Sequence, residues 1–106
     1  MDKKVLVTEI RKVVEAFKQE SKTFDFVSLS SIYGTDDSFE LNLKADWLLA
    51  MPRYKAIEAV VSKLYEIMDK RYLIPINGIH IIENHENLQE ISYLIIEKPT
   101  NYPLAA

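Results

Sequence analysis

The sequence predicts an α+β fold in the order α-β-β-α-β-β, with one largely antiparallel sheet and two helices on one of its faces. Two long segments carry the 3.6-residue apolar period of amphipathic helices. Each is followed by segments rich in the β-branched and aromatic residues that favour strands. The 106 residues are the usual size of one domain. We therefore expect a single domain over residues 1–98 and a C-terminal tail over 99–106.

The first helix is expected over residues 3–20. Its apolar side chains recur at the spacing of one helical face, at Val7, Ile10, Val14 and Phe17. Asp2 is expected to cap the first turn, because its carboxylate can accept free backbone N–H groups. Residues 21–23 break the pattern.

The next two segments predict an antiparallel pair of strands. Residues 24–33 are apolar on both parities, which indicates two covered faces or a bulge near residues 28–31. A loop over residues 34–38 follows. Strict alternation from Phe39 to Trp47 then predicts a strand with one core face and one wet face. Trp47 is in phase with the apolar side, so we expect it to anchor the core.

The second helix is expected after Pro52, which suits a first helical turn. Its stripe consists of Ile57, Val61, Leu64 and Met68. Residues 73–76 contain Pro75, so they predict an edge piece or a linker. Asn77-Gly78 has the composition of a two-residue turn.

The last two strands are expected at residues 79–83 and 90–97, as a hairpin around a polar loop over 84–89. Both segments are apolar on each parity, which indicates central strands or a second face buried by a partner. The last three residues of the tail, Leu104-Ala105-Ala106, match the end of a bacterial degradation tag.

Composition excludes several classes of function. The chain has no cysteine, so disulfides, thiolate catalysis and Cys-type zinc sites are excluded. It lacks the apolar run of a signal or a membrane span and has no glycine-rich phosphate motif. We expect a soluble, cytoplasmic protein with no cofactor and no membrane partner.

Titratable clusters in the sequence are interpreted as solvated turns. His80 and His85 lie five residues apart on opposite parities, which is poor spacing for a metal site. Asp36, Asp37 and Glu40 lie in or beside a polar loop. We therefore assign no catalytic or metal-binding residue and expect a non-enzymatic protein.

Two candidate binding surfaces remain. The start of the second helix could bind an anion through Arg53, Tyr54, Lys55 and free backbone N–H groups. The last two strands leave apolar residues for a sheet face that helices do not cover, namely Ile79, Ile81, Tyr93 and Ile95. Because large exposed apolar patches mark interaction sites, we expect a homo-oligomer or a protein partner.

The element order resembles two groups of known proteins. Helix, hairpin, helix and a final long hairpin are similar to phage tail-terminator proteins, which implies a virion assembly subunit that forms rings. The order also resembles class II KH-type and BolA-like domains, which implies nucleic-acid binding. Residues 1–22 carry six basic and four acidic side chains, so a basic helix face supports that alternative, although the net charge is −3. No site residue is transferred from either group.

Overall fold

The structure is a computed structural model that describes residues 3–32, 38–83 and 93–97. Its elements are α1 (Lys3–Gln19), β1 (Phe26–Ser31), β2 (Phe39–Lys44), α2 (Asp46–Leu49), α3 (Arg53–Ile67), α4 (Lys70–Leu73), β3 (Ile76–Ile81) and β4 (Tyr93–Glu97). The strands form one open sheet in the order β3-β2-β1-β4. The α+β class is confirmed, and α2 and α4 are short helices that the sequence did not predict.

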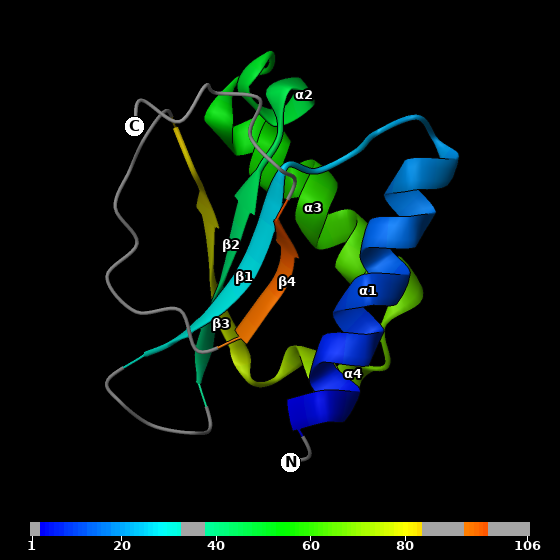
Figure 1. Cartoon of the computed structure of the whole chain (residues 1–106), viewed down its shortest axis with the longest axis vertical. Helices are drawn as coiled ribbons and strands as arrows, with labels where there is room; N and C mark the ends of the chain where they lie inside the picture. The colour runs from blue at the N-terminus through cyan, green and yellow to red at the C-terminus, as the bar shows by residue number, and fades with distance from the viewer. Residues whose placement is uncertain (1–2, 33–37, 84–92, 98–106) are drawn as a thin grey trace, which may run out of the picture.

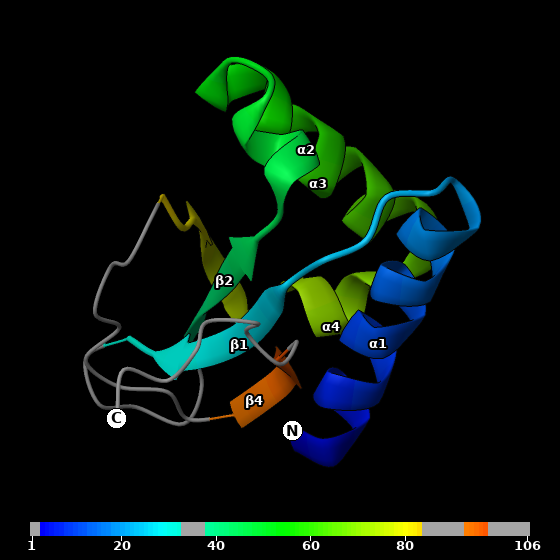
Figure 2. The same ribbon diagram turned by 45° about the horizontal axis from the view of Figure 1, so that its top comes forward.

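The sheet is mixed. β1 pairs antiparallel with both β2 and β4, whereas β2 pairs parallel with β3. Parallel neighbours need a crossover connection, and α2, α3 and α4 supply it between β2 and β3. The antiparallel prediction therefore holds for β1 with its neighbours and not for β2 with β3. In two views α1 and α3 lie to the same side of the strands (Figures 1 and 2).

The hairpin predicted from Ile79 to Glu97 does not form, because β3 and β4 lie at opposite edges of the sheet. The apolar residues on both parities have another cause. In β4, Ile95 is an extra residue between the pairs Val27–Ile96 and Ser28–Leu94. Such a bulge changes which parity faces the core. The bulge that the sequence predicts near residues 28–31 of β1 thus lies in the adjacent strand, β4.

Asn77-Gly78 is not a turn but part of β3. The β2–β3 register passes from Phe39–Ile76 to Glu40–Gly78, so Asn77 is the extra residue of a bulge. Its side-chain amide donates to Ser38 Oγ at 2.9 Å. Pro75 directly precedes the strand, a position that an edge strand tolerates.

One hydrophobic core fills the space between the sheet and the two long helices. The fully buried lines of the helices are Leu6, Ile10, Val13 and Phe17 in α1 and Ala56, Val60 and Leu64 in α3. The predicted stripes differ by about one residue, since Val7, Val14 and Ile57 lie at the margin of the core and Val61 is only partly buried. In α3, Ala56 takes a core position that a search for large apolar residues overlooks.

Trp47 lies in α2 rather than in β2, which ends at Lys44. Its ring packs against Phe17 and Phe24, with centroids 5.1 and 5.4 Å away. Its Nε1–H donates to the carbonyl oxygen of Thr23 at 2.9 Å. Trp47 therefore joins the end of α1 to the start of the β2–α3 connection.

An ion pair links the end of α1 to α3. Lys63 Nζ donates to the Glu20 carboxylate, and the Lys63 side chain is only 15% exposed. This hydrogen bond lowers the pKa of Glu20 and raises the pKa of Lys63 from their ordinary values. The pair therefore favours the charged form of both groups.

Candidate interaction site

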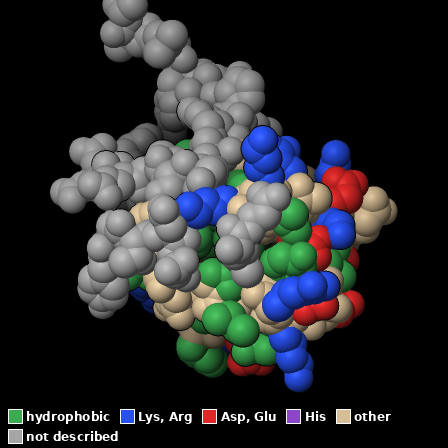
Figure 3. Space-filling view, turned by 90° about the horizontal axis from the view of Figure 1, so that it is seen from below, with side chains coloured by type: hydrophobic (Ala, Val, Ile, Leu, Met, Phe, Trp, Pro, Cys, Tyr) green, Lys and Arg blue, Asp and Glu red, His purple; other side chains and the backbone are tan. Residues whose placement is uncertain are grey.

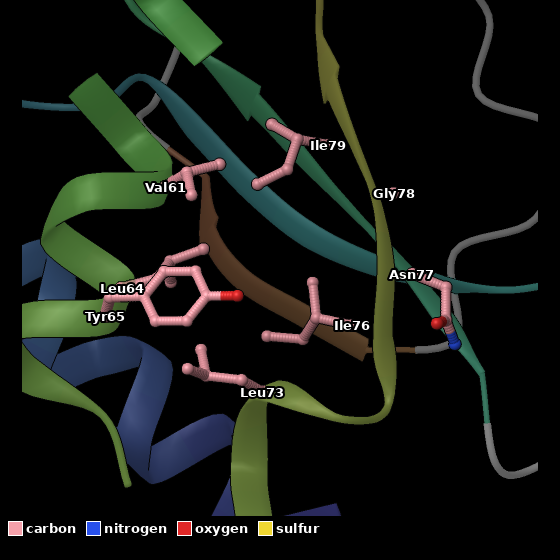
Figure 4. A pocket seen from close by; sticks show the side chains of 8 residues that line it. All are labelled: Val61, Leu64, Tyr65, Leu73, Ile76, Asn77, Gly78 and Ile79. Carbon is pink, nitrogen blue, oxygen red and sulfur yellow. The ribbon is translucent and has the colours of Figure 1, made fainter. Parts of the chain in front are cut away.

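An apolar groove lies between α3 and β3, at one edge of the sheet. It has a volume of about 230 Å³ and is lined by Val61, Leu64, Tyr65, Leu73, Ile76, Asn77, Gly78 and Ile79. Figure 4 shows Val61 and Tyr65 reaching from α3 toward Ile79 and Ile76, while the side chain of Asn77 points away. Four apolar side chains from α3 and β3 thus face each other across the groove.

Large apolar side chains are exposed in and beside this groove. Tyr65 is 66% exposed, and Ile74, which follows α4 and precedes β3, is 76% exposed. Val61 and Tyr65 are one helical turn apart, so they present a single face. Exposed apolar side chains that lie together make this groove a candidate interaction surface.

The outer edge of β3 borders the groove. Ile82 N–H donates to the carbonyl oxygen of Leu43 at 2.8 Å, toward β2. Because backbone groups alternate in direction along a strand, those of Ile79 and Ile81 are directed away from β2. Within residues 3–32, 38–83 and 93–97, no strand pairs with this edge. Lys and Pro, which commonly protect edge strands, are absent between Ile76 and Ile82.

The opposite face of the sheet carries a polar row in register across three strands, consisting of Ser28, Asn42 and His80. Asn42 is fully buried, and its Nδ2 donates to Ser28 Oγ at 3.1 Å and Ser30 Oγ at 2.8 Å. Its Oδ1 is also buried, and it has no hydrogen-bond partner among the residues that the structure describes. Buried carbonyl groups in this state are uncommon and destabilising.

Glu40 and Gly78 lie in the next row of that polar face. A Cβ built on Gly78 would lie 3.4 Å from Glu40 Oε2. The Glu40 carboxylate therefore extends over Gly78, toward the β3 edge. His80 lies two residues farther along β3 on the same face, because it is in register with Asn42.

The structure does not bring the four predicted interaction residues together. Ile79 and Ile81 are on β3, whereas Tyr93 and Ile95 are on β4 at the other edge. Ile81 and Ile95 are buried in the core, and Ile79 packs against it. They do not form one surface, and a role in an interaction stays a prediction for each of them.

The predicted anion site is an exposed helix start. Arg53, Tyr54 and Lys55 are all exposed, and Pro52 precedes them at the N-cap without a side-chain hydrogen bond. The backbone N–H of Lys55 donates to the Pro52 carbonyl oxygen at 3.0 Å, so this donor is already used. Anion binding at this position stays a prediction.

A second, shallow depression lies between α1 and α4. Its charged lining residues are Lys4, Glu9, Lys12, Asp69 and Arg71. Lys12 pairs with Glu9, and Arg71 pairs with Asp69. In the space-filling view, basic and acidic side chains lie next to one another at this end of the molecule (Figure 3). The depression is thus of mixed charge rather than a basic patch.

The described ranges contain neither a metal-type cluster of His, Asp and Glu nor a helix that is long and apolar enough to cross a bilayer. The predicted roles of Asp2, Asp36, Asp37 and His85 and the expected tail fall outside those ranges. Comparisons with protein-family models, with curated proteins and with solved structures found no match.

Sequence reasoning missed the α3 side of the groove. The sequence predicts Val61 as part of the core stripe, whereas in the structure it lines the groove together with Tyr65. The interpretation of Asn77-Gly78 as a turn also hid the length of β3. Pro75 was the one available signal, because proline before a strand favours an edge position.

Proposed function

We propose that this chain is a non-enzymatic protein–protein interaction or assembly module that self-associates through its sheet. The observation that carries the proposal is the β3 edge, with which no strand of the described residues pairs, beside an apolar groove. Strand addition at such an edge satisfies backbone groups, while the adjacent groove takes up apolar side chains.

Size-exclusion chromatography with light scattering tests the proposal. We expect a mass above the 12.3 kDa of one chain at tens of micromolar. Tyr65→Glu should shift the mass toward the monomer, because it places a charge in the groove. Tyr54→Glu is the matched control, since Tyr54 is also 66% exposed on α3 and does not line the groove. A monomer at every concentration contradicts self-association.

The tail-terminator-like assembly subunit is a specific form of this proposal. It is supported by the resemblance in element order. That resemblance is weaker in the structure, because β3 and β4 do not form the final hairpin. A ring requires a head-to-tail contact, in which two different surfaces of the chain meet. A mass of several chains would favour this form over a dimer.

Nucleic-acid binding is the alternative in a different class. The exposed basic side chains of α1 support it, but Glu9 pairs with Lys12 and reduces the local positive potential. A gel shift in low salt that disappears with added salt would favour this alternative, because phosphate contacts weaken steeply with salt.

A further inference from the structure

We infer that the partner at the β3 edge is a second copy of this chain, bound about a two-fold axis beside Ile79. β3 of one copy pairs antiparallel with β3 of the other. This inference rests on the proposed function, because it specifies the contact through which the module self-associates.

The backbone supplies the first argument. The N–H and C=O groups of Ile79 are directed away from β2, so two copies can exchange both hydrogen bonds at this residue. The Asn77 bulge and Pro75 disrupt regular pairing toward the start of β3. The regular part of the edge is therefore short and follows the bulge.

Charge and space supply the second argument. A two-fold axis beside Ile79 places Gly78 of one copy opposite His80 of the other. The Glu40 side chain lies over Gly78, because that residue has no side chain of its own, and its carboxylate reaches toward the β3 edge. An N–H of the imidazole from the second copy can donate to this carboxylate, as a charge-assisted hydrogen bond.

Self-complementarity identifies the occupant. Glu40 with Gly78 forms one half of the contact, and His80 forms the other, on the same edge of the same chain. Because the axis is two-fold, Glu40 of each copy meets His80 of the other, and the contact forms twice. On the face of the sheet that carries the helices, the same axis places Ile79 of one copy, which lines the groove, beside Ile79 of the other.

Charge reversal tests this contact. We expect His80→Glu and Glu40→Lys each to weaken dimerisation at least tenfold in analytical ultracentrifugation. The double variant should restore it, because it exchanges the two partners. Glu15→Lys, on the exposed face of α1, is the matched control and should leave the dimer unchanged. Circular dichroism verifies that each variant is folded.

A cysteine cross-link tests the register, and the chain has no native cysteine to interfere. Directly opposed Cα atoms of this kind lie about 5.5 Å apart, within the range of a disulfide. Ile79→Cys should therefore form a covalent dimer on oxidation, whereas Thr8→Cys on the exposed face of α1 should not.

The outcomes separate the inference from the proposed function. A monomer at all concentrations overturns both. A dimer or larger assembly that forms without the Ile79→Cys cross-link, and that charge reversal leaves unchanged, overturns only the two-fold β3 contact. Cross-linking together with rescue by the double variant supports both.

Discussion

Trp47 illustrates what a single residue reveals. The alternation of apolar and polar residues from Phe39 to Trp47 predicted correctly that the ring of Trp47 packs against the core, because Trp47 is in phase with the apolar residues of the preceding strand. It did not predict that the chain turns into α2 at Asp46, because a four-residue helix is too short for a periodic signal. The ring is therefore held by Phe17 and Phe24 rather than by strand neighbours.

The first prediction separates the ring of Trp47 from its N–H group. Trp47→Phe keeps the aromatic contacts and loses one hydrogen bond, so it should cost about 1 kcal/mol of unfolding free energy. Trp47→Ala also removes the ring and should cost about 3 kcal/mol. Urea unfolding followed by circular dichroism measures both, since each variant lacks the only tryptophan. Equal losses would show that the ring contacts contribute nothing.

Asn42 carries the second prediction. Its amide donates to two serines, and its buried Oδ1 has no partner within the described part of the chain. Asn42→Val and Ser28→Ala should each be destabilising, while the double variant should lose less than their sum, with a coupling of about 1 kcal/mol. Removing both partners leaves fewer unsatisfied groups than removing one. A double-mutant cycle by urea unfolding measures the coupling, and strict additivity would contradict it.

Element by element, the sequence predicted helices better than strand partners. The periods of α1 and α3 are local, so their existence and approximate faces could be read directly. Strand pairing is set by distant residues, and the apolar residues of 79–82 and 91–96 gave no information on which neighbours they join. Asn77-Gly78 was misread because the same dipeptide suits a turn and a bulge.

Gly78→Ala distinguishes these two structures and is the third prediction. In β3 the added Cβ makes an ordinary contact with Glu40, so stability should be unchanged or rise by up to about 1 kcal/mol. In a two-residue turn, where glycine takes a positive φ, alanine would instead cost about 1 kcal/mol or more. Urea unfolding at a concentration where the chain is monomeric distinguishes the two outcomes.

The fourth prediction concerns the ion pair between Glu20 and Lys63, which joins α1 to α3. Because folding lowers the pKa of Glu20, its contribution is present above the usual pKa of Glu, about 4, and is lost as the pH falls through the lowered pKa. Because folding raises the pKa of Lys63, its contribution is lost as the pH rises through that raised pKa. Between these windows the stabilisation is complete.

Thermal unfolding of Glu20→Gln against pH checks this prediction. The difference from the wild type should be largest near pH 7 and should shrink in acid, where Glu20 is protonated in both states. Glu15→Gln, which changes an exposed glutamate within α1, is the control. A difference that is independent of pH would mean that Glu20 acts through packing rather than charge.

Which strands lie at the edges of the sheet is a property of the whole molecule and not of any single element. The sheet has two edges, and their identity depends on the order β3-β2-β1-β4, which combines one parallel and two antiparallel pairings. Local patterns placed the functional surface on a hairpin whose two strands are in fact at opposite edges. The α3–β3 groove exists only because the crossover returns the chain beside β2, so it could not be predicted before that pairing was known.

Association at the β3 edge leads to the fifth prediction. A partner that binds the folded chain and not the unfolded chain raises stability by mass action. The midpoint of thermal unfolding of the wild type should therefore rise with protein concentration, and that of His80→Glu should not. The control is Glu15→Lys, which should follow the wild type. A wild-type midpoint that stays constant over a hundredfold range of concentration that spans the monomer–dimer transition would contradict this prediction, because a contact made only by the folded chain must raise the midpoint with concentration.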